Sequence, residues 1–438
     1  MTVPSLILSA PGSGSGKTIA ATGILRAFAR RGVRVGAAKS GPDYIDGGFL
    51  AAAAGVGRSN LDVWSMRSGT LATEVSRHHG FDLLLIEGAV GLFDGIGFEG
   101  RGSTADLAAA LGAPVVLVLD ARGAATSLAA TLLGFRQFRR DVTVSGVIAS
   151  RVGGPAHADT IARACMAACP DVAFLGCLPR DDGLVLPSRH LGLVQATEQP
   201  DLEGLMERAA DLSDQHLDLD HLLRLARPAV VGPLAERPPL PPLGQRIAVA
   251  FDDAFGFAYG HVLAGWQDAG AELLPFSPLA GEGPDLAADA VFLPGGYPEL
   301  YAAHIAGAEA FLVGLGAAAR LGRPIYGECG GFMVLGRALI DDRGYAHPMA
   351  NLLPIVTSFQ HRQRHLGYRR AQLLTDGPLG RRGLVYAGHE FHYSTLVEAG
   401  EAPGLFQVSD GQARSLGVAG AMVGSVFGSY LHLLDQQD

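Results

Sequence analysis

The sequence predicts an α/β protein whose N-terminal half forms a doubly wound parallel sheet. Short apolar runs alternate with alanine-rich helical patterns, and these runs lack the polar alternation of strands with one face in water. A second series of the same kind follows a proline-rich segment. With 438 residues, 48% of them hydrophobic, the chain is long enough for two or three domains with ordinary cores.

Six buried strands are expected in the first half, because each run is apolar enough to be covered by helices on both faces. They are expected at 4–10, 33–39, 81–89, 114–121, 142–150 and 172–179. Helical periodicity between them predicts helices at 17–31, 71–79, 103–111, 125–139 and 158–168. Strand and helix therefore alternate as βα units, which build a parallel sheet.

A proline-rich segment divides the chain, since its prolines can neither continue a helix nor donate to a strand ladder. We expect an N-terminal domain at 1–226, a linker at 227–244 and a C-terminal domain at 245–438. The C-terminal series of apolar runs occupies 246–252, 271–278, 290–296, 323–329 and 425–434.

Composition excludes several classes of protein. The net charge of −9 argues against binding nucleic acid through its phosphate backbone. No apolar run approaches the roughly 20 residues that span a bilayer, and the N-terminus lacks the features of a signal peptide. We therefore expect a cytoplasmic protein without a membrane partner. Three of the four cysteines have spacings that match no zinc motif, so we expect buried thiols at Cys165, Cys169 and Cys177.

The segment PGSGSGKT follows the first expected strand and begins the first expected helix, as a phosphate-binding loop does. Its glycines let backbone N–H groups approach phosphate oxygens, and the helix N-terminus favours negative charge. Lys17 is expected to reach the β- and γ-phosphates and Thr18 to bind Mg²⁺. Pro11 departs from the strict pattern, and Gly12 stands where partition ATPases carry a signature lysine. The expected ATP-binding residues are Gly12, Ser13, Gly14, Ser15, Gly16, Lys17 and Thr18.

Acidic residues follow the next two strands of the series. They are Asp43 and Asp46 after the second strand, and Glu87 and Asp94 at the end of the third. Because the carboxyl ends of parallel strands meet at one edge, we expect these acids near the phosphate loop, as an Mg²⁺–ATP site requires. Turn chemistry is the alternative for each acid taken alone, since Asp is common after Pro and before Gly. Lys17 and Lys39, which ends the second strand, are the only lysines in the chain.

The segment RPIYGECGGFMVLG predicts a buried strand, a tight turn and an apolar helix, the elbow geometry that presents a nucleophile above a sheet. Cys329 would be that nucleophile, and we expect the helix N-terminus to lower the pKa of its thiol. His432, which follows an apolar strand, is the candidate base, with His389 and His392 as rivals. The backbone of Gly295 and Gly296 is the candidate oxyanion hole. The alternative is a core cysteine in a glycine-rich turn.

Eight motifs occur in the order found in cobyrinic acid a,c-diamide synthases, a family that includes the hydrogenobyrinic acid enzymes: PGSGSGKT, KSGPDYID, IEGAVGLFDG, PSRHLGLV, LPGGYPEL, YGECGGFMVLG, GHEFHYS and SYLH. The chain resembles this family over nearly its whole length. The resemblance implies a dethiobiotin-synthetase-like P-loop domain followed by a class I glutamine amidotransferase domain. It also implies a ligase of cobalamin biosynthesis. Ammonia from glutamine would travel internally and displace phosphate from ATP-phosphorylated carboxylates of a corrinoid, at the a and c side chains.

The resemblance also implies roles for individual residues. Cys329 would be the nucleophile and His432 its base. Lys17 and Lys39 would neutralise charge on the transferred phosphoryl group and on the attacking carboxylate. Substrate-side residues would be Asp43 and Tyr44, and the Mg²⁺ ligands Thr18, Asp46, Glu87 and Asp94.

Two positions depart from the family pattern. Class I glutamine amidotransferases usually carry Glu two residues after the histidine, where this chain has Leu434, so the orienting role is unassigned. The strand end that meets adenine often carries Asn-Arg, and this chain has Ser150 and Arg151. Corrinoid carboxylates need basic partners in an acidic protein, and Arg364 lies in the densest basic stretch. A solvated surface run is the alternative for that stretch.

Two other functions fit part of the pattern. One is a related amidotransferase for another tetrapyrrole carboxylate, of the cobyric acid synthase or Ni-sirohydrochlorin diamide synthase type. The other is a P-loop regulatory switch with an inactive amidotransferase domain. The expected partners are therefore a corrinoid, glutamine and ATP, with Mg²⁺ as cofactor. The sequence leaves open whether the corrinoid holds cobalt, which side chain is amidated first, and whether the chain forms a homo-oligomer.

Overall fold

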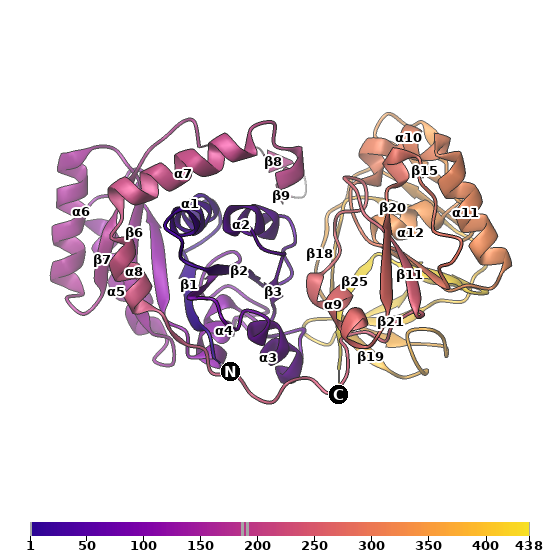
Figure 1. The fold of residues 1–438 in the computed structure, drawn as a ribbon, viewed down its shortest axis with the longest axis horizontal. Coiled ribbons are helices and arrows are strands. Elements are labelled where there is room, and N and C mark those ends of the chain that lie inside the picture. The colour runs from indigo at the N-terminus through magenta and orange to yellow at the C-terminus, as the bar shows by residue number, and fades with distance from the viewer. Residues whose placement is uncertain (1, 185–187, 190–191, 438) are drawn as a thin grey trace. The chain divides into compact units, whose positions relative to one another are not determined.

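Parallel strands form the centre of each of the two units into which the chain divides (Figure 1). A computed structural model describes residues 2–184, 188–189 and 192–437. The first unit comprises 1–64 and 68–235, and the second comprises 65–67 and 236–438. Within the second unit, the guanidinium of Arg67 pairs with the fully buried carboxylate of Asp435 (2.7 Å).

The first unit is built on an eight-stranded sheet in the order β3-β2-β4-β1-β5-β6-β7, with β10 added beside β1. All neighbours along this path are parallel, and only β10 is antiparallel. The strands are β1 (Pro4–Ser9), β2 (Val35–Ser40), β3 (Asn60–Leu61), β4 (Leu83–Glu87), β5 (Val115–Asp120), β6 (Val144–Val152), β7 (Ala173–Pro179) and β10 (Arg227–Pro228). The chain runs outward from β1 in both directions, so the predicted doubly wound parallel sheet is confirmed.

Helices cover this sheet, with α1, α2 and α7 on one side and α4 on the other (Figure 1). The core on the first side joins Leu6 and Leu8 of β1 to Phe28 of α1 and Met206 of α7. The elements are α1 (Lys17–Arg30), α2 (Asp46–Ala54), α3 (Ser68–Ser76), α4 (Thr104–Leu111), α5 (Ser127–Phe138), α6 (Pro155–Ala168), the 3₁₀ turn η1 (Ala196–Glu198), α7 (Leu202–His216) and α8 (Leu219–Leu225). The short strands β8 (Ser188–Arg189) and β9 (Gly192–Leu193) pair with each other. The motif PSRHLGLV lies largely outside the described residues.

Helix α2 was not predicted, because its first turn contains two glycines and follows a segment that resembles a turn. Asp46 is therefore the first residue of a helix rather than part of a loop. The segment predicted as a linker also begins with ordered structure, since β10 pairs with the start of β1.

The second unit contains a six-stranded sheet in the order β12-β11-β13-β14-β24-β23, parallel except at β23. Its strands are β11 (Arg246–Ala250), β12 (Glu272–Phe276), β13 (Ala290–Leu293), β14 (Ile325–Glu328), β23 (Ala421–Val423) and β24 (Val426–Ser429). The helical elements are α9 (Gly260–Asp268), η2 (Pro278–Ala280), η3 (Pro298–Tyr301), α10 (Ala302–Gly307), α11 (Glu309–Arg320) and α12 (Gly330–Leu335).

Two further sheets complete this unit. A five-stranded antiparallel sheet has the order β22-β21-β18-β19-β25, and a four-stranded sheet has the order β16-β15-β17-β20. Their strands are β15 (Ala338–Ile340), β16 (Ala346–Pro348), β17 (Ile355–Ser358), β18 (His365–Leu373), β19 (Val385–His392), β20 (Thr395–Ala399), β21 (Phe406–Asp410), β22 (Ser415–Ala419) and β25 (Leu431–Gln436). The final apolar run, expected as one strand, divides at Tyr430 into β24 and β25, which belong to different sheets.

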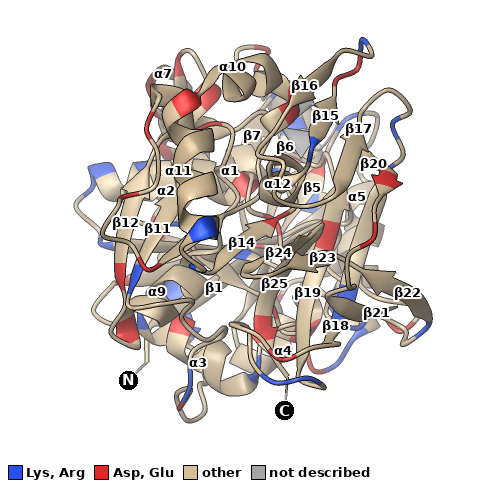
Figure 2. Ribbon diagram, turned by 90° about the vertical axis from the view of Figure 1, so that its right-hand side faces the viewer, with Lys and Arg blue, Asp and Glu red and all other residues tan. Residues whose placement is uncertain are grey.

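The distribution of charged residues and the burial of the cysteines can be compared with the expectations from the sequence. Basic and acidic residues are interspersed along the ribbon in the view of Figure 2. Cys165 and Cys169 are buried as expected, Cys177 is half-buried, and all of these thiols are free.

Within the described residues no single helix is long and apolar enough to cross a membrane. Only the pair Pro298–Gly307 and Glu309–Arg320, bent by 85°, passes that test when joined.

The packing of α1 on α7 gives a test of this fold. A Cβ at Gly23 would overlap the carbonyl of Ala209 and lie 2.5 Å from Ser213 Oγ, so Gly23→Ala should destabilise the first unit by about 1–3 kcal/mol. Gly134→Ala on the exposed side of α5 meets no atom within 4 Å and should stabilise by about 0.5–1 kcal/mol. Thermal unfolding measures both changes. Equal effects of the two substitutions would contradict the described contact.

Candidate active sites

The phosphate-binding loop joins β1 to α1 and is held by the end of β6. Gly16 has a φ of 86°, a left-handed conformation that glycine adopts at little cost. Ser150 Oγ donates to the Ser15 carbonyl (2.8 Å), and Arg151 Nη2 donates to the Gly14 carbonyl (2.6 Å). Ser150 and Arg151 therefore contact the loop itself.

The outer side of this loop is open. Ser13 and Gly14 are exposed, and a Cβ placed on Gly12 or Gly14 would meet no atom within 4 Å. The loop can therefore accept a ligand against its backbone, as the sequence predicts for phosphate.

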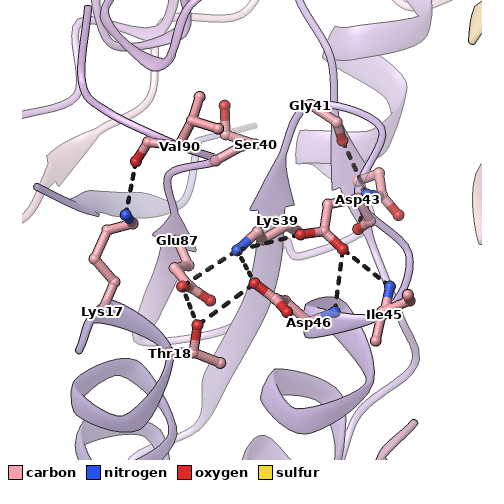
Figure 3. Close-up of polar contacts among 12 residues, drawn as sticks. Lys17, Thr18, Lys39, Ser40, Gly41, Asp43, Ile45, Asp46, Glu87 and Val90 are labelled. Atoms are coloured by element: carbon pink, nitrogen blue, oxygen red, sulfur yellow. Dashed lines mark hydrogen bonds and ion pairs between the residues drawn. The ribbon is translucent and has the colours of Figure 1, made fainter. Parts of the chain in front are cut away.

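The two lysines have different environments (Figure 3). Lys17 Nζ donates to the carbonyls of Gly12 (2.9 Å) and Val90 (2.6 Å), and burial lowers the pKa of Lys17. Lys39 Nζ lies among carboxylates, 2.8 Å from Asp46 Oδ2 and 3.2 Å from Glu87 Oε1. Burial alone would lower the pKa of Lys39, but the surrounding acids, Glu87 first, raise it. The structure thus adds to the expected phosphate role of Lys17 that Lys39, unlike Lys17, has carboxylates as its partners.

Three oxygen-bearing side chains converge beside Lys39. Thr18 Oγ1 donates to Glu87 Oε1 (2.7 Å) and lies 3.5 Å from Asp46 Oδ2. Glu87 is 1% exposed, and burial raises its pKa. Its Oε2 has no hydrogen-bond partner among the described residues. Oxygen donors from a hydroxyl and two carboxylates, one atom still unpartnered, fit the ligand preference of Mg²⁺.

Three other predicted residues have different positions. Asp43 Oδ1 accepts from the backbone N–H groups of Ile45 (3.0 Å) and Asp46 (3.1 Å) at the start of α2, and its Oδ2 is 3.7 Å from Lys39 Nζ. Burial and the neighbouring Asp46 carboxylate raise the pKa of Asp43. Asp94 Oδ2 accepts from Gly91 N (3.0 Å) and stabilises its own turn, and its charge acts on Lys17 rather than on Lys39. Tyr44 is buried, at 3% exposure.

Cys329 lies at the elbow between β14 and α12. Its φ of 46° is a conformation that non-glycine residues rarely adopt, and such strain is typical of a nucleophile at this turn. The close approach of β13 requires a glycine nearby, because a Cβ at Gly331 would overlap the Leu293 carbonyl. The predicted strand–turn–helix geometry is therefore present.

The expected depression of the thiol pKa is wrong. Burial raises the pKa of Cys329, which is 2% exposed, and nearby acids, Glu299 first, act in the same direction. The N–H of Gly330 opposes this shift, but α12 has only six residues and its end cannot outweigh desolvation. The thiol therefore needs a base to lose its proton.

His432 is the imidazole next to Cys329. A Cβ at Gly295 would clash with His432 Cε1 and lie 3.2 Å from both Cys329 Cβ and His432 Nε2, so both side chains pack against the same glycine. Burial lowers the pKa of His432, which keeps its ring neutral. Its rivals have other contacts: His389 Nδ1 lies 3.4 Å from Tyr259 Oη, and His392 Nε2 lies 2.8 Å from Glu390 Oε1.

The first residue of α12, Gly330, lies next to the predicted oxyanion hole at Gly295 and Gly296. A Cβ on Gly330 would lie 3.0 Å from Gly296 N, so the backbone N–H groups of these residues are neighbours. Gly296 N has no acceptor among the described residues, while the N–H of Gly330 interacts with the Cys329 thiol. The sequence interpretation missed Gly330 as a donor, although it directly follows the nucleophile. It also missed Glu328, an acid that ends an apolar strand and is 3% exposed.

A second group of polar residues borders the nucleophile. Phe391, whose carbonyl lies 3.8 Å from Cys329 Sγ, is flanked by Glu390 and His392. The potential ligand atoms of His365, Glu390 and His392 lie within 4.8 Å of one another, but the two imidazole rings are stacked at 12°. Lone pairs in parallel ring planes cannot converge on one ion, and Arg369 Nε already pairs with Glu390 (2.7 Å). Burial alone would raise the pKa of Glu390, but its partners lower it to about 2. We interpret this group as an ion-pair network.

The buried cluster around Lys39 gives a stability test. Lys39→Met removes the cation facing Glu87 and Asp46, so unfolding should become easier by about 3–5 kcal/mol. Without the cation the folded-state pKa of these acids rises, so the loss should grow as pH increases above about 4.3. Arg34→Met removes the exposed pair with Asp82 and should have little effect. Denaturant unfolding at several pH values measures both, and a pH-independent difference would contradict the interpretation.

Comparison with known proteins agrees with this geometry. Residues 6–194 match the family model of the CobQ/CobB/MinD/ParA nucleotide binding domain, and residues 246–438 match the CobB/CobQ-like glutamine amidotransferase domain. The chain is 49% identical over 432 residues to hydrogenobyrinate a,c-diamide synthase from Brucella suis, covering 98% of each chain. The enzyme of that name from Mesorhizobium japonicum is 47% identical over 99% of each chain, and that from Rhodobacter capsulatus 49% over 98%.

Relatives of about half-identical sequence therefore span nearly the entire chain, and both domain models match in the order that the two sites require. The chain belongs to the hydrogenobyrinate a,c-diamide synthase family.

Proposed function

We propose that this protein is an ATP- and glutamine-dependent ligase that converts the a and c side-chain carboxylates of hydrogenobyrinate into amides, in cobalamin biosynthesis. One observation carries the proposal. A single chain holds a phosphate-binding loop with converging acids and, separately, a strained cysteine beside a neutral imidazole. The relatives, which are hydrogenobyrinate a,c-diamide synthases, indicate the substrate.

The first unit would activate the carboxylate. The loop from Gly12 to Thr18 would bind the phosphates of ATP, with Lys17 exchanging its carbonyl contacts for phosphate oxygens. Thr18, Asp46 and Glu87 would hold Mg²⁺, which supplies charge stabilisation for the transferred phosphoryl group. The substrate carboxylate attacks the γ-phosphorus, ADP leaves, and an acyl phosphate forms. Ammonia then attacks the acyl carbon and displaces phosphate, which gives the amide.

Lys39 would act in this unit mainly as a positioning residue. Its three carboxylate partners come from β4, from α2 and from the turn before α2, so its ammonium group sets the relative positions of the acids. This differs from the direct charge neutralisation expected for both lysines, and it assigns that direct role to Lys17.

The second unit would release ammonia from glutamine. His432 Nε2 accepts the thiol proton of Cys329, and the sulfur attacks the side-chain carbonyl carbon. The resulting oxyanion would accept hydrogen bonds from the backbone near Gly296. The proton on His432 passes to the leaving ammonia, and water then hydrolyses the thioester to glutamate.

Replacement of the nucleophile tests whether glutamine hydrolysis and amidation are carried out by different units. Cys329→Ser should abolish glutamine-dependent amidation of hydrogenobyrinate but leave ammonia-dependent amidation with ATP and Mg²⁺ near the wild-type rate, because only the second unit uses the thiol. Mass spectrometry of the corrinoid counts the amides, with cobyrinate as a parallel substrate. Cys177→Ser, a half-buried thiol of the first unit, is the matched control. Loss of both activities in Cys329→Ser alone would contradict the proposal.

Arg364 is the proposed contact with the acidic substrate. It is exposed in the loop before β18, whereas the neighbouring Arg362 pairs with Asp342 and Arg369 pairs with Glu390. Arg364→Ala should raise the KM for hydrogenobyrinate by about three- to tenfold, the loss expected for one exposed charge pair, without changing glutamine hydrolysis. Arg382→Ala removes the same charge from another exposed position and is the control. An unchanged KM would remove Arg364 from the substrate site.

A further inference from the structure

The nucleophile pair lacks a carboxylate at the position where related amidotransferases usually place one. That position is Leu434, which is fully buried and apolar. Because burial raises the pKa of the thiol and lowers that of His432, the pair needs a group that favours the correct tautomer of the imidazole. Glu328, buried beside the nucleophile, has no role in the reaction described above.

The contacts of Glu328 orient its carboxylate. Oε1 accepts from Tyr326 Oη (2.7 Å) and from the backbone N–H of Leu433 (3.1 Å), the residue after His432. Oε2 lies 3.8 Å from His432 Nδ1, which is within ion-pair distance but longer than a hydrogen bond. One oxygen is therefore held by two donors, and the other faces the imidazole.

The orientation of His432 matches this arrangement. The Cε1 and Nε2 edge of the ring faces Gly295, against which Cys329 also packs, while Nδ1 faces Glu328. The ring thus lies between a nucleophile and a carboxylate, with one nitrogen toward each, as in a catalytic triad. The acid comes from the residue before the nucleophile, not from a residue after the histidine.

We infer that Glu328 is the positioning residue of the glutaminase site, holding His432 in the tautomer whose Nε2 can accept the thiol proton. This inference rests on the proposed function of the second unit. A carboxylate at 3.8 Å favours the tautomer with hydrogen on Nδ1 through its negative charge, and Nε2 then carries the free lone pair. When Nε2 takes the proton from Cys329, the carboxylate stabilises the imidazolium until ammonia leaves with that proton.

Protonation of Glu328 would control this tautomer. Burial raises the pKa of Glu328 to about 8, although Tyr326 and the Leu433 N–H act in the opposite direction. Below that pH a protonated carboxyl group would donate to Nδ1 and leave hydrogen on Nε2, the form that cannot act as a base. The other titratable groups near His432 are His389 (ring centroids 5.4 Å apart), Tyr259 (6.3 Å) and His392. Burial lowers the pKa of His389 to about 3, so it stays neutral in this range.

Glu328→Gln tests the inference directly. The amide oxygen can keep the contacts with Tyr326 and Leu433, which places the NH₂ group toward Nδ1 and forces hydrogen onto Nε2. Glutamate release by the full-length enzyme should fall in kcat on the order of 10²–10⁴-fold, with the KM for glutamine within about threefold. The rise of wild-type activity through pH of about 8 should also disappear. Ammonia-dependent amidation should be unchanged.

Two variants complete the experiment. Glu272→Gln makes the same replacement at an exposed ion pair of the second unit and should behave as wild type. Tyr326→Phe removes a donor that favours the charged carboxylate, so the inflection should move to higher pH, and this remains measurable if Glu328→Gln does not fold.

The outcomes separate the two hypotheses. Wild-type kcat and pH profile in Glu328→Gln, or an unmoved inflection in Tyr326→Phe, would overturn the role of Glu328 alone. Absence of glutamine hydrolysis in the wild type would overturn the proposed function and this inference together. A purely structural role for Glu328 predicts no change in the pH profile of either variant that folds.

Discussion

Charge buried at the carboxyl ends of parallel strands has to be paired, and the positions of the reactive side chains in both units follow from this constraint. An unpaired ion in a low-dielectric interior costs several kcal/mol, so Lys39 is stable at 2% exposure only because three carboxylates surround it. Those acids come from different elements, and the pairing therefore fixes the ends of β2 and β4 relative to α2. The Mg²⁺ ligands proposed here are members of the same cluster.

The same constraint has a different solution in the second unit. Glu328 is buried with no lysine or arginine partner in the part of the chain that the structure describes, and two neutral donors, Tyr326 Oη and Leu433 N, hold one of its oxygens. Neutral donors compensate desolvation only in part, which leaves the pKa raised. A carboxyl group that changes charge near neutral pH can influence the imidazole beside it.

Backbone crowding is the second condition for the glutaminase site. The elbow at Cys329 combines a strained φ of 46° with glycines where β13 and the 294–296 turn approach most closely. A side chain at Gly295 would clash with the imidazole of His432, and one at Gly331 would overlap the Leu293 carbonyl. Strain is tolerated because the surrounding backbone leaves no alternative. The short helix α12 contributes position and an N–H group rather than a strong dipole.

Part of the fold and of the two sites could be predicted from the sequence alone. Continuous apolar runs predicted six of the eight strands of the first sheet, and glycine spacing predicted both the phosphate loop and the cysteine elbow, because each depends on neighbouring residues only. The sequence also indicated the family, since eight ordered motifs are more specific than any one. Helix α2 was missed because its glycine-containing start has the composition of a turn.

The sequence by itself determined the local structural elements, which are the strands, the phosphate loop and the nucleophilic elbow, and the types of residue near them. Only the tertiary structure decided which partners each of those residues has and how its pKa is shifted. It separated Lys17, bound to carbonyls, from Lys39, bound to acids. It placed Asp94 Oδ2 against the backbone of its own turn, and it brought Glu328 toward His432 across 104 positions of sequence. It also reversed the expected shift of the thiol pKa. The physical reason is the same in each case: burial and long-range pairing set the energy of a charge, and neither can be read from the residues next to it in the chain.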